Sequence, residues 1–347
     1  APTLAEANAG DAMAKARLDQ ARAQGNPLLR VEGSYGAGRI DNGGFFGITA
    51  DNVTPLALQA TAEMPLYAGG RVSSAIDQAR SGADAARFGV EQARLQTIVS
   101  AVSTYTDVLT SRKLEAHYGQ LVSELTETER QAELRFRVGE IASSDLAQAR
   151  ARRAEGEAGL AEAQGRRASA EAAFQRLTGK PAGELTPLPD VPRVPPTLDE
   201  ALGMARASNP ALHQAKSGVE AARAGVRSAK AEAMPTIGAF AEAAHVRDQF
   251  FPGYKADTVS AGIRGRWTLW NGGRVSSQTR AANAGLAASE ARLRQADQAL
   301  EGMVVDAWQG LATARRMTQA SLLRREAANE ALRGTKLEAR VGAKPTL

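Results

Sequence analysis

The sequence contains no cysteine, so its 347 residues can form no disulfide and offer no thiol for a lipid anchor. Aromatic residues make up only 5% of the chain, which favours closely packed helices over one large globular core. No run of about 18 apolar residues occurs, so the sequence predicts no transmembrane helix. The 43 basic and 38 acidic residues are interspersed, which indicates solvated helix faces and not a nucleic-acid-binding surface.

Enzymatic motifs are missing as well. The three histidines, His117, His213 and His245, are far apart and lack the spacing of metal ligands. The sequence contains no phosphate-binding loop, no HExxH motif and no nucleophile elbow. We therefore expect no catalytic residue, no metal and no cofactor.

What the chain does contain is an internal repeat. Gly-Gly-Arg-Val-Ser-Ser at residues 69–74 recurs at residues 272–277, and Arg-Val-Gly at residues 137–139 recurs at residues 340–342. Both motifs recur 203 residues later, with no insertion between them in either copy. A match of this kind predicts a duplication, with a first repeat over 1–178, a proline-rich linker over 179–196 and a second repeat over 197–347.

Each repeat predicts one very long helix. No proline occurs between Arg71 and Gly139 or between Arg274 and Gly342, and strong helix formers dominate both stretches. A helix of this length would be roughly 100 Å long, far beyond the usual length in a globular domain. Apolar residues recur in steps of three, four and seven, which is typical of packed long helices. A soluble coiled-coil scaffold remains an alternative at this point.

Four segments show strand periodicity, at about 27–39, 56–68, 235–247 and 258–270. Within the first, Leu29 and Val31 alternate with Arg30 and Glu32, whereas residues 236–246 alternate poorly. Strands of about ten tilted residues suit the wall of a transmembrane β-barrel, although a small soluble sheet would give the same pattern. Four strands cannot close a barrel, for which about eight are needed, so several chains would have to pool their hairpins. Three copies would supply twelve strands.

The ends of these elements carry further signals. Tyr67 and Trp270 are expected at strand ends, where an aromatic ring suits a membrane–water interface. After Gly139, either Ser143 or Ser144 can cap a returning helix, which would complete a helical hairpin. By the repeat offset, Leu347 corresponds to Ser144. We therefore expect the returning helix of the second hairpin to lie beyond this sequence, over roughly 35 further residues by analogy with the first repeat.

The order of helix, strand hairpin, long helix, tip and returning helix, present twice, resembles the TolC family of outer-membrane channel proteins. The most specific stretches are Leu-Tyr-Ala-Gly-Gly-Arg at residues 66–71, Leu-Trp-Asn-Gly-Gly-Arg at residues 269–274, and the two Arg-Val-Gly motifs. The resemblance implies a mixed α and β fold: a homotrimer with a β-barrel of four strands per protomer in the outer membrane, continued by an α-helical coiled-coil barrel through the periplasm.

The resemblance also implies roles for particular residues. The periplasmic aperture would be locked by Asp145 and Lys344. The other implied sites are the tips that bind a periplasmic adaptor protein (Arg137, Val138, Gly139, Arg340, Val341 and Gly342) and the turns between barrel and tunnel (Gly69, Gly70, Arg71, Gly272, Gly273 and Arg274).

The resulting functional hypothesis is a passive exit duct in the outer membrane, which contacts outer-membrane lipid and is served by the adaptor and by an inner-membrane ABC transporter or proton-driven pump. In lacking a lipid-anchor cysteine and in having plain Gly-Gly-Arg turns in both repeats, the sequence resembles the secretion members of the TolC family more closely, and this resemblance implies type I protein secretion. Efflux of drugs or other small molecules is the alternative, and a soluble coiled-coil scaffold is the alternative from another class.

Overall fold

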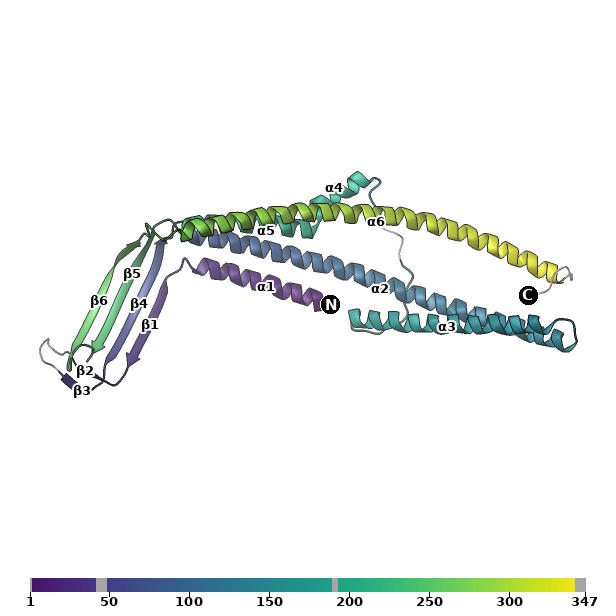
Figure 1. Ribbon diagram of the computed structural model, residues 1–347, viewed down its shortest axis with the longest axis horizontal. Coiled ribbons are helices and arrows are strands. Elements are labelled where there is room, and N and C mark those ends of the chain that lie inside the picture. The colour runs from purple at the N-terminus through teal and green to yellow at the C-terminus, as the bar shows by residue number, and fades with distance from the viewer. Residues whose placement is uncertain (1, 42–48, 189–192, 341–347) are drawn as a thin grey trace. The chain divides into compact units, whose positions relative to one another are not determined.

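The computed structural model describes residues 2–41, 49–188 and 193–340. In chain order the elements are α1 (Pro2–Ala23), β1 (Leu28–Tyr35), β2 (Gly38–Asp41), β3 (Thr49–Val53), β4 (Leu56–Tyr67), α2 (Arg71–Arg137), α3 (Ser143–Thr178), α4 (Leu198–Ser208), α5 (Pro210–Ala231), β5 (Thr236–Arg247), β6 (Lys255–Arg266) and α6 (Arg274–Arg340) (Figure 1). They form two compact units. We call residues 6–91 and 208–299 the sheet unit, and residues 1–5, 92–207 and 300–347 the hairpin unit.

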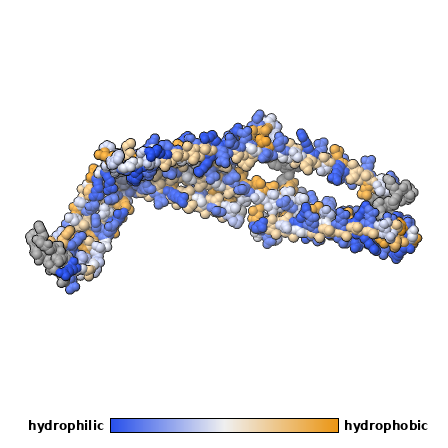
Figure 2. All heavy atoms as spheres, viewed as in Figure 1, coloured by the Kyte–Doolittle hydropathy of each residue, from blue (hydrophilic) through white to orange (hydrophobic). Residues whose placement is uncertain are grey.

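The two long helices appear as predicted. α2 and α6 each have 67 residues, and each begins at the arginine after Gly-Gly and ends at the arginine of Arg-Val-Gly. The helices are therefore equivalent at the repeat offset, and the absence of proline lets each run unbroken. Hydrophilic side chains are spread along the helices on the face shown in Figure 2. No helix in the described part of the chain combines the length and the apolarity that crossing a membrane requires.

The second repeat begins with a broken helix where the first has one helix. α4 ends at Ser208, and α5 begins at Pro210 after a cap at Asn209, whose side-chain oxygen accepts a hydrogen bond from the Leu212 backbone N–H at 3.0 Å. Proline suits the first turn of a helix because the N–H that it lacks would have no partner there. The sequence break at Asn209-Pro210 is thus a helix boundary.

The sheet unit contains one four-stranded antiparallel sheet in the order β1-β4-β5-β6 (Figure 1). The first repeat supplies β1 and β4, and the second supplies β5 and β6, so the two hairpins join through β4 and β5. β2 and β3 pair separately in a two-stranded sheet. Strands β1 and β6 form the two edges of the four-stranded sheet.

The strand bounds differ from the predicted ones at both edges. The first strand was expected over 27–39, but β1 stops at Tyr35, which pairs with Leu56 directly after Pro55. The last was expected over 258–270, but β6 covers 255–266. It ends where its partner begins, since Arg266 pairs with Thr236, the first residue of β5. The alternation after Arg266 therefore continues outside the sheet.

The hairpin unit is built on α2 and α3, which run antiparallel on either side of the tip (Figure 1). A small buried cluster of Ala132, Leu146 and Ala149, with Ile141 against it, closes the hairpin next to the tip. The predicted serine cap is wrong, because the residue before the helix is Ala142, which has no side-chain acceptor. The Ala142 backbone N–H instead donates to the Asp145 carboxylate at 3.3 Å.

Candidate functional sites

The turns between strand and long helix depend on paired glycines. Gly69 and Gly70 have φ of +63° and +87°, and Gly272 and Gly273 have φ of +64° and +82°. This left-handed conformation is strained for any residue with a Cβ atom. Gly69 is also closely packed, because a Cβ there would lie 2.4 Å from the Met234 Cβ, whereas a Cβ at Gly272 would meet nothing within 4 Å. The equivalent turns thus have different surroundings.

The two predicted interface aromatics are placed differently. Tyr67 is the last residue of β4, as expected. Trp270 lies four residues beyond the end of β6 and is 84% exposed, so its predicted place at a strand end is wrong. Nearby, the Trp267 indole N–H donates to the Ala233 backbone carbonyl at 3.1 Å. This contact ties Trp267, the residue after the end of β6, to the backbone that follows α5.

The first tip has the geometry of a tight helix terminus. Arg137 is the last residue of α2, and Gly139 has φ of +76°. Its N–H donates to the Phe136 carbonyl at 3.0 Å, and the Glu140 N–H donates to the Arg135 carbonyl at 2.9 Å. Val138 is 77% exposed at the end of the hairpin.

The second tip is described only up to Arg340, the last residue of α6. Val341, Gly342 and Lys344 lie outside the described residues. Asp145 caps the backbone of α3, as described above, so its place in an aperture lock with Lys344 stays a prediction.

Arginine–carboxylate pairs link α2 and α3 along the hairpin. Glu129 on α2 lies 3.4 Å from the Arg150 guanidinium and 3.1 Å from that of Arg153. Glu115 lies 3.0 Å from Arg167.

Within α2, a bidentate hydrogen bond from Arg130 and a hydrogen bond from Gln131 lower the pKa of Glu127 to about 2.

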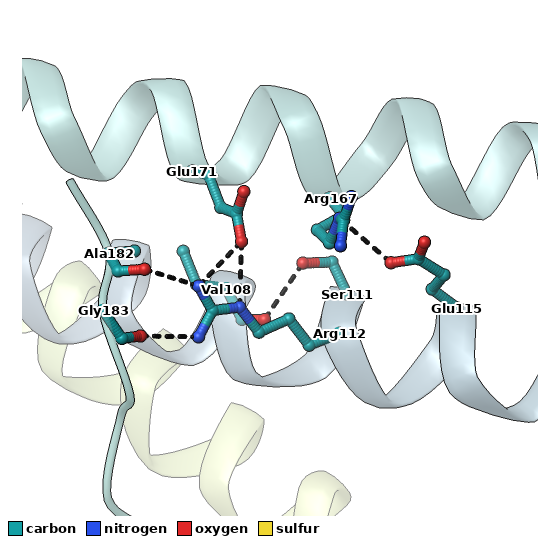
Figure 3. Close-up of polar contacts among 8 residues, drawn as sticks. All are labelled: Val108, Ser111, Arg112, Glu115, Arg167, Glu171, Ala182 and Gly183. Carbon is teal, nitrogen blue, oxygen red and sulfur yellow. Dashed lines mark hydrogen bonds and ion pairs between the residues drawn. The ribbon is translucent and has the colours of Figure 1, made fainter.

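A polar clamp holds the linker against this hairpin (Figure 3). The Arg112 guanidinium donates to Glu171 at 2.9 Å, to the Ala182 carbonyl at 2.6 Å and to the Gly183 carbonyl at 2.7 Å. Each guanidinium nitrogen thus has an acceptor. Further along the linker, the Tyr105 hydroxyl donates to the Thr186 carbonyl at 2.6 Å. Sequence reasoning missed this clamp, because no local pattern joins segments that lie 59 to 81 residues apart.

The four-stranded sheet has two chemically different faces, because residues paired across an antiparallel sheet share a face. One face carries apolar rows, such as Leu29–Ala62–Ala241–Ala261 and Val31–Ala60–Ala243–Val259. The other carries polar rows, such as Arg30–Thr61–Glu242–Ser260. β5 fits this division although its alternation is weak, because alanines take the apolar positions. We call these the apolar face and the polar face.

No other layer covers the apolar face within the described residues of the sheet unit. Leu29 is 72% exposed, Ile263 is 72% exposed and Val259 is 86% exposed. None of the four strands of this sheet contains a fully buried residue. A soluble protein buries such a face against a helix or a second sheet, so this face requires a non-aqueous partner.

Comparison with known proteins decides the family. The family model described as "Outer membrane efflux protein" matches residues 1–180 and again residues 201–347. The chain belongs to the outer membrane efflux protein family. The resemblance to the TolC family is thereby confirmed, and the two matches correspond to the two repeats.

One relative is outer membrane efflux protein BepC of Brucella suis biovar 1 (strain 1330), to which the chain is 28% identical over 284 residues. That alignment covers 81% of this chain and 62% of BepC, so the chain spans less than two thirds of its curated relative. The outer-membrane channel OprN has the same fold, with a TM-score of 0.80 and 22% identity over 99% of this chain and 78% of OprN. The Campylobacter jejuni CmeC outer membrane channel gives a TM-score of 0.77 at 15% identity, over 99% of this chain and 75% of CmeC.

Membership of this efflux family settles three expectations. The mixed fold of long helices and antiparallel strands is confirmed. The outer-membrane location and the absence of an enzymatic activity are confirmed by the nature of the family. The coiled-coil scaffold is excluded as a description of the chain. Within the described residues, no group of three or more metal-binding side chains occurs.

Proposed function

We propose that this chain is one subunit of a trimeric outer-membrane efflux channel. The observation that carries the proposal is the four-stranded sheet, which has one polar face and, among the residues that the structure describes, an uncovered apolar face and two edges without a partner strand. Such a sheet meets the requirements of a barrel segment, with apolar residues toward lipid and polar residues toward the lumen. β4, β5 and β6 each have 12 residues, enough to cross the hydrocarbon core when tilted.

The unpaired edges call for neighbouring copies. In the described sheet, β1 pairs only with β4 and β6 pairs only with β5, so the outer hydrogen-bonding groups of β1 and β6 need neighbours. Pairing β6 of one copy with β1 of the next satisfies both. Three copies give a closed barrel of twelve strands, whereas a single copy has half the strands that the smallest filled barrels contain.

For the transported cargo, we propose small molecules and not secreted proteins. The sequence favoured protein secretion, but the matching family and BepC are both described as efflux proteins. A deletion strain would separate the two. Increased sensitivity to toxic small molecules with unchanged protein in the medium supports efflux, and loss of an exported protein from the medium supports secretion.

The partners are part of the same proposal. The Arg-Val-Gly tips, with Val138 exposed, would dock onto a periplasmic adaptor that connects to an inner-membrane pump. Asp145 and Lys344 would help to hold the aperture closed. Asp145→Ala combined with Lys344→Ala is then expected to raise the single-channel conductance in planar bilayers, and an unchanged conductance would remove the lock from the proposal.

Cysteine cross-linking tests the trimer directly, because the chain has no cysteine of its own. Val31→Cys in β1 is combined in turn with a cysteine at position 257, 259, 261 or 263 of β6, since barrel stagger shifts the register between subunits. At least one pair should give disulfide-linked oligomers up to a trimer. Ala60→Cys with Val259→Cys is the control, because β5 separates these strands. A monomer throughout the series would refute the proposal.

A further inference from the structure

A cavity of about 220 Å³ lies in the sheet unit, at the root of the sheet. It is formed by the ends of β4, β5 and β6 and by the first residue of α2, Arg71. Its charged lining residues are Arg71, Arg264, Arg266 and Glu63. Three arginines and one glutamate therefore line the cavity.

Arg264 is already paired. Its guanidinium lies 3.1 Å from Glu242 and 3.7 Å from Glu63, and it stacks over the Phe240 ring at 4.3 Å from the centroid. These contacts place both carboxylates and the ring on the polar face with Arg264. Glu63, the only acidic lining residue, is thus used within the protein.

Arg71 and Arg266 are the remaining cations. Neither guanidinium has a carboxylate partner among the residues that the structure describes. The equivalent of Arg71 in the second repeat, Arg274, differs in both respects: it lies 3.5 Å from Glu232 and does not line the cavity. The same motif thus gives a paired arginine in one repeat and an unpaired one beside a cavity in the other.

The apolar part of the lining is as important as the charge. Met64, Ile237, Phe240 and Tyr67 border the same cavity. Guanidinium groups bind carboxylate, sulfonate or phosphate oxygens through paired N–H donors, and they are more weakly hydrated than ammonium groups. A molecule with an acidic group and a flat apolar body could use both parts of the lining.

We propose that this cavity binds organic anions, with Arg71 and Arg266 holding the acidic group and Phe240, which lies on the same face of the sheet as Arg266, contacting the apolar body. The inference rests on the proposed function, because it takes the polar face as the wall of the channel. In a trimer the site would occur three times around the lumen and would slow or sort acidic cargo as it passes.

The test uses the full-length protein and 2-naphthoate as the probe. In planar bilayers, 2-naphthoate should reduce the channel current in a saturable way. Arg71→Gln with Arg266→Gln should raise the half-blocking concentration roughly tenfold or more, since two charge-assisted contacts are lost. Arg274→Gln with Arg30→Gln removes the same charge from the sheet unit outside the cavity, and it should change that concentration by less than about twofold.

Two further measurements make the outcome decisive. Neutral 2-naphthol should block weakly and equally in all variants, because only the anion uses the arginines. Isothermal titration of 2-naphthoate into the detergent-solubilised protein should show saturable binding that the cavity variant loses. Equal effects of both double variants, or naphthol blocking as well as naphthoate, would overturn the site. A protein that binds naphthoate but forms no channel would overturn the proposed function alone.

Discussion

Alanine at Gly69 and at Gly272 provides a matched comparison within one molecule. Both glycines open a Gly-Gly-Arg turn, with φ of +63° and +64°. An alanine Cβ in this left-handed region costs about 1–2 kcal/mol at either position. The backbone strain is therefore common to both variants, and the difference between them reports on packing.

The packing term applies to Gly69 alone. Its added Cβ would lie 2.4 Å from the Met234 Cβ and 3.0 Å from the Ala231 carbonyl oxygen. Neither atom is the free end of a side chain, so relief requires the backbone after α5 to move. Overpacking of this kind costs about 1–3 kcal/mol. We expect Gly69→Ala to lower the free energy of unfolding by about 2–5 kcal/mol and Gly272→Ala by about 1–2 kcal/mol.

Urea unfolding followed by far-ultraviolet circular dichroism measures this difference. With equal urea dependence in both variants, the midpoint for Gly69→Ala should lie clearly below that for Gly272→Ala. A Gly69→Ala, Met234→Ala double variant does not remove the Cβ contact and should recover little. Equal midpoints for the two single variants would refute the close approach at Gly69.

Three other predictions concern the hairpin unit. Arg112→Ala should lower the free energy of unfolding by about 2 kcal/mol and make the proline-rich linker accessible to proteases. Arg112→Lys should recover only part of this loss, because lysine lacks the planar guanidinium group that reaches all three acceptors. An unchanged rate of proteolysis in Arg112→Ala would contradict the clamp. Gly159→Ala should lower the free energy of unfolding by about 1 kcal/mol, because the added Cβ would lie 2.4 Å from the Tyr118 ring. Gly165→Ala has open space around the added Cβ and should raise the free energy of unfolding by about 0.5–1 kcal/mol. Urea unfolding measures both changes. Carbon-13 NMR of the Glu127 carboxyl should give a pKa of about 2, rising toward 4.5 in Arg130→Ala. Since the folded-state pKa is depressed, the stabilising contribution of Glu127 is complete above pH 4.5 and is lost as the pH falls through about 2.

The helices were predictable from the sequence because their signals are local and occur twice. The absence of proline and the recurring motifs placed the ends of α2 and α6 at the Gly-Gly-Arg and Arg-Val-Gly motifs, where the structure has them. The strand ends were less predictable because pairing sets them. The alternation of Trp267 and Leu269 predicted more strand after Arg266, but β5 offers no residue before Thr236 for them to pair with.

The sites were predictable where a motif marks a backbone conformation, and not where distant segments meet. The Gly-Gly turns and the Gly139 tip lie where the motifs predicted turns, and these glycines have positive φ. The Arg112 clamp joins two helices and the linker, and the charge of the cavity depends on Arg266, which the sequence presented only as one polar residue of a strand. The two copies of Gly-Gly-Arg look identical in sequence, so the difference between Arg71 and Arg274 could come only from their neighbours in space.

The uncovered apolar face of the sheet affects the solubility of the protein before its subunits assemble. A newly exported monomer would expose the apolar face of the sheet and two unpaired edge strands to water. Both features promote aggregation, because edge strands pair readily with other chains. We therefore expect the unassembled monomer to be short-lived or to be bound by a chaperone. If the protein is synthesised faster than its subunits can assemble, we expect it to aggregate in the cell envelope. The unassembled monomer would then be the form of the protein most prone to aggregation.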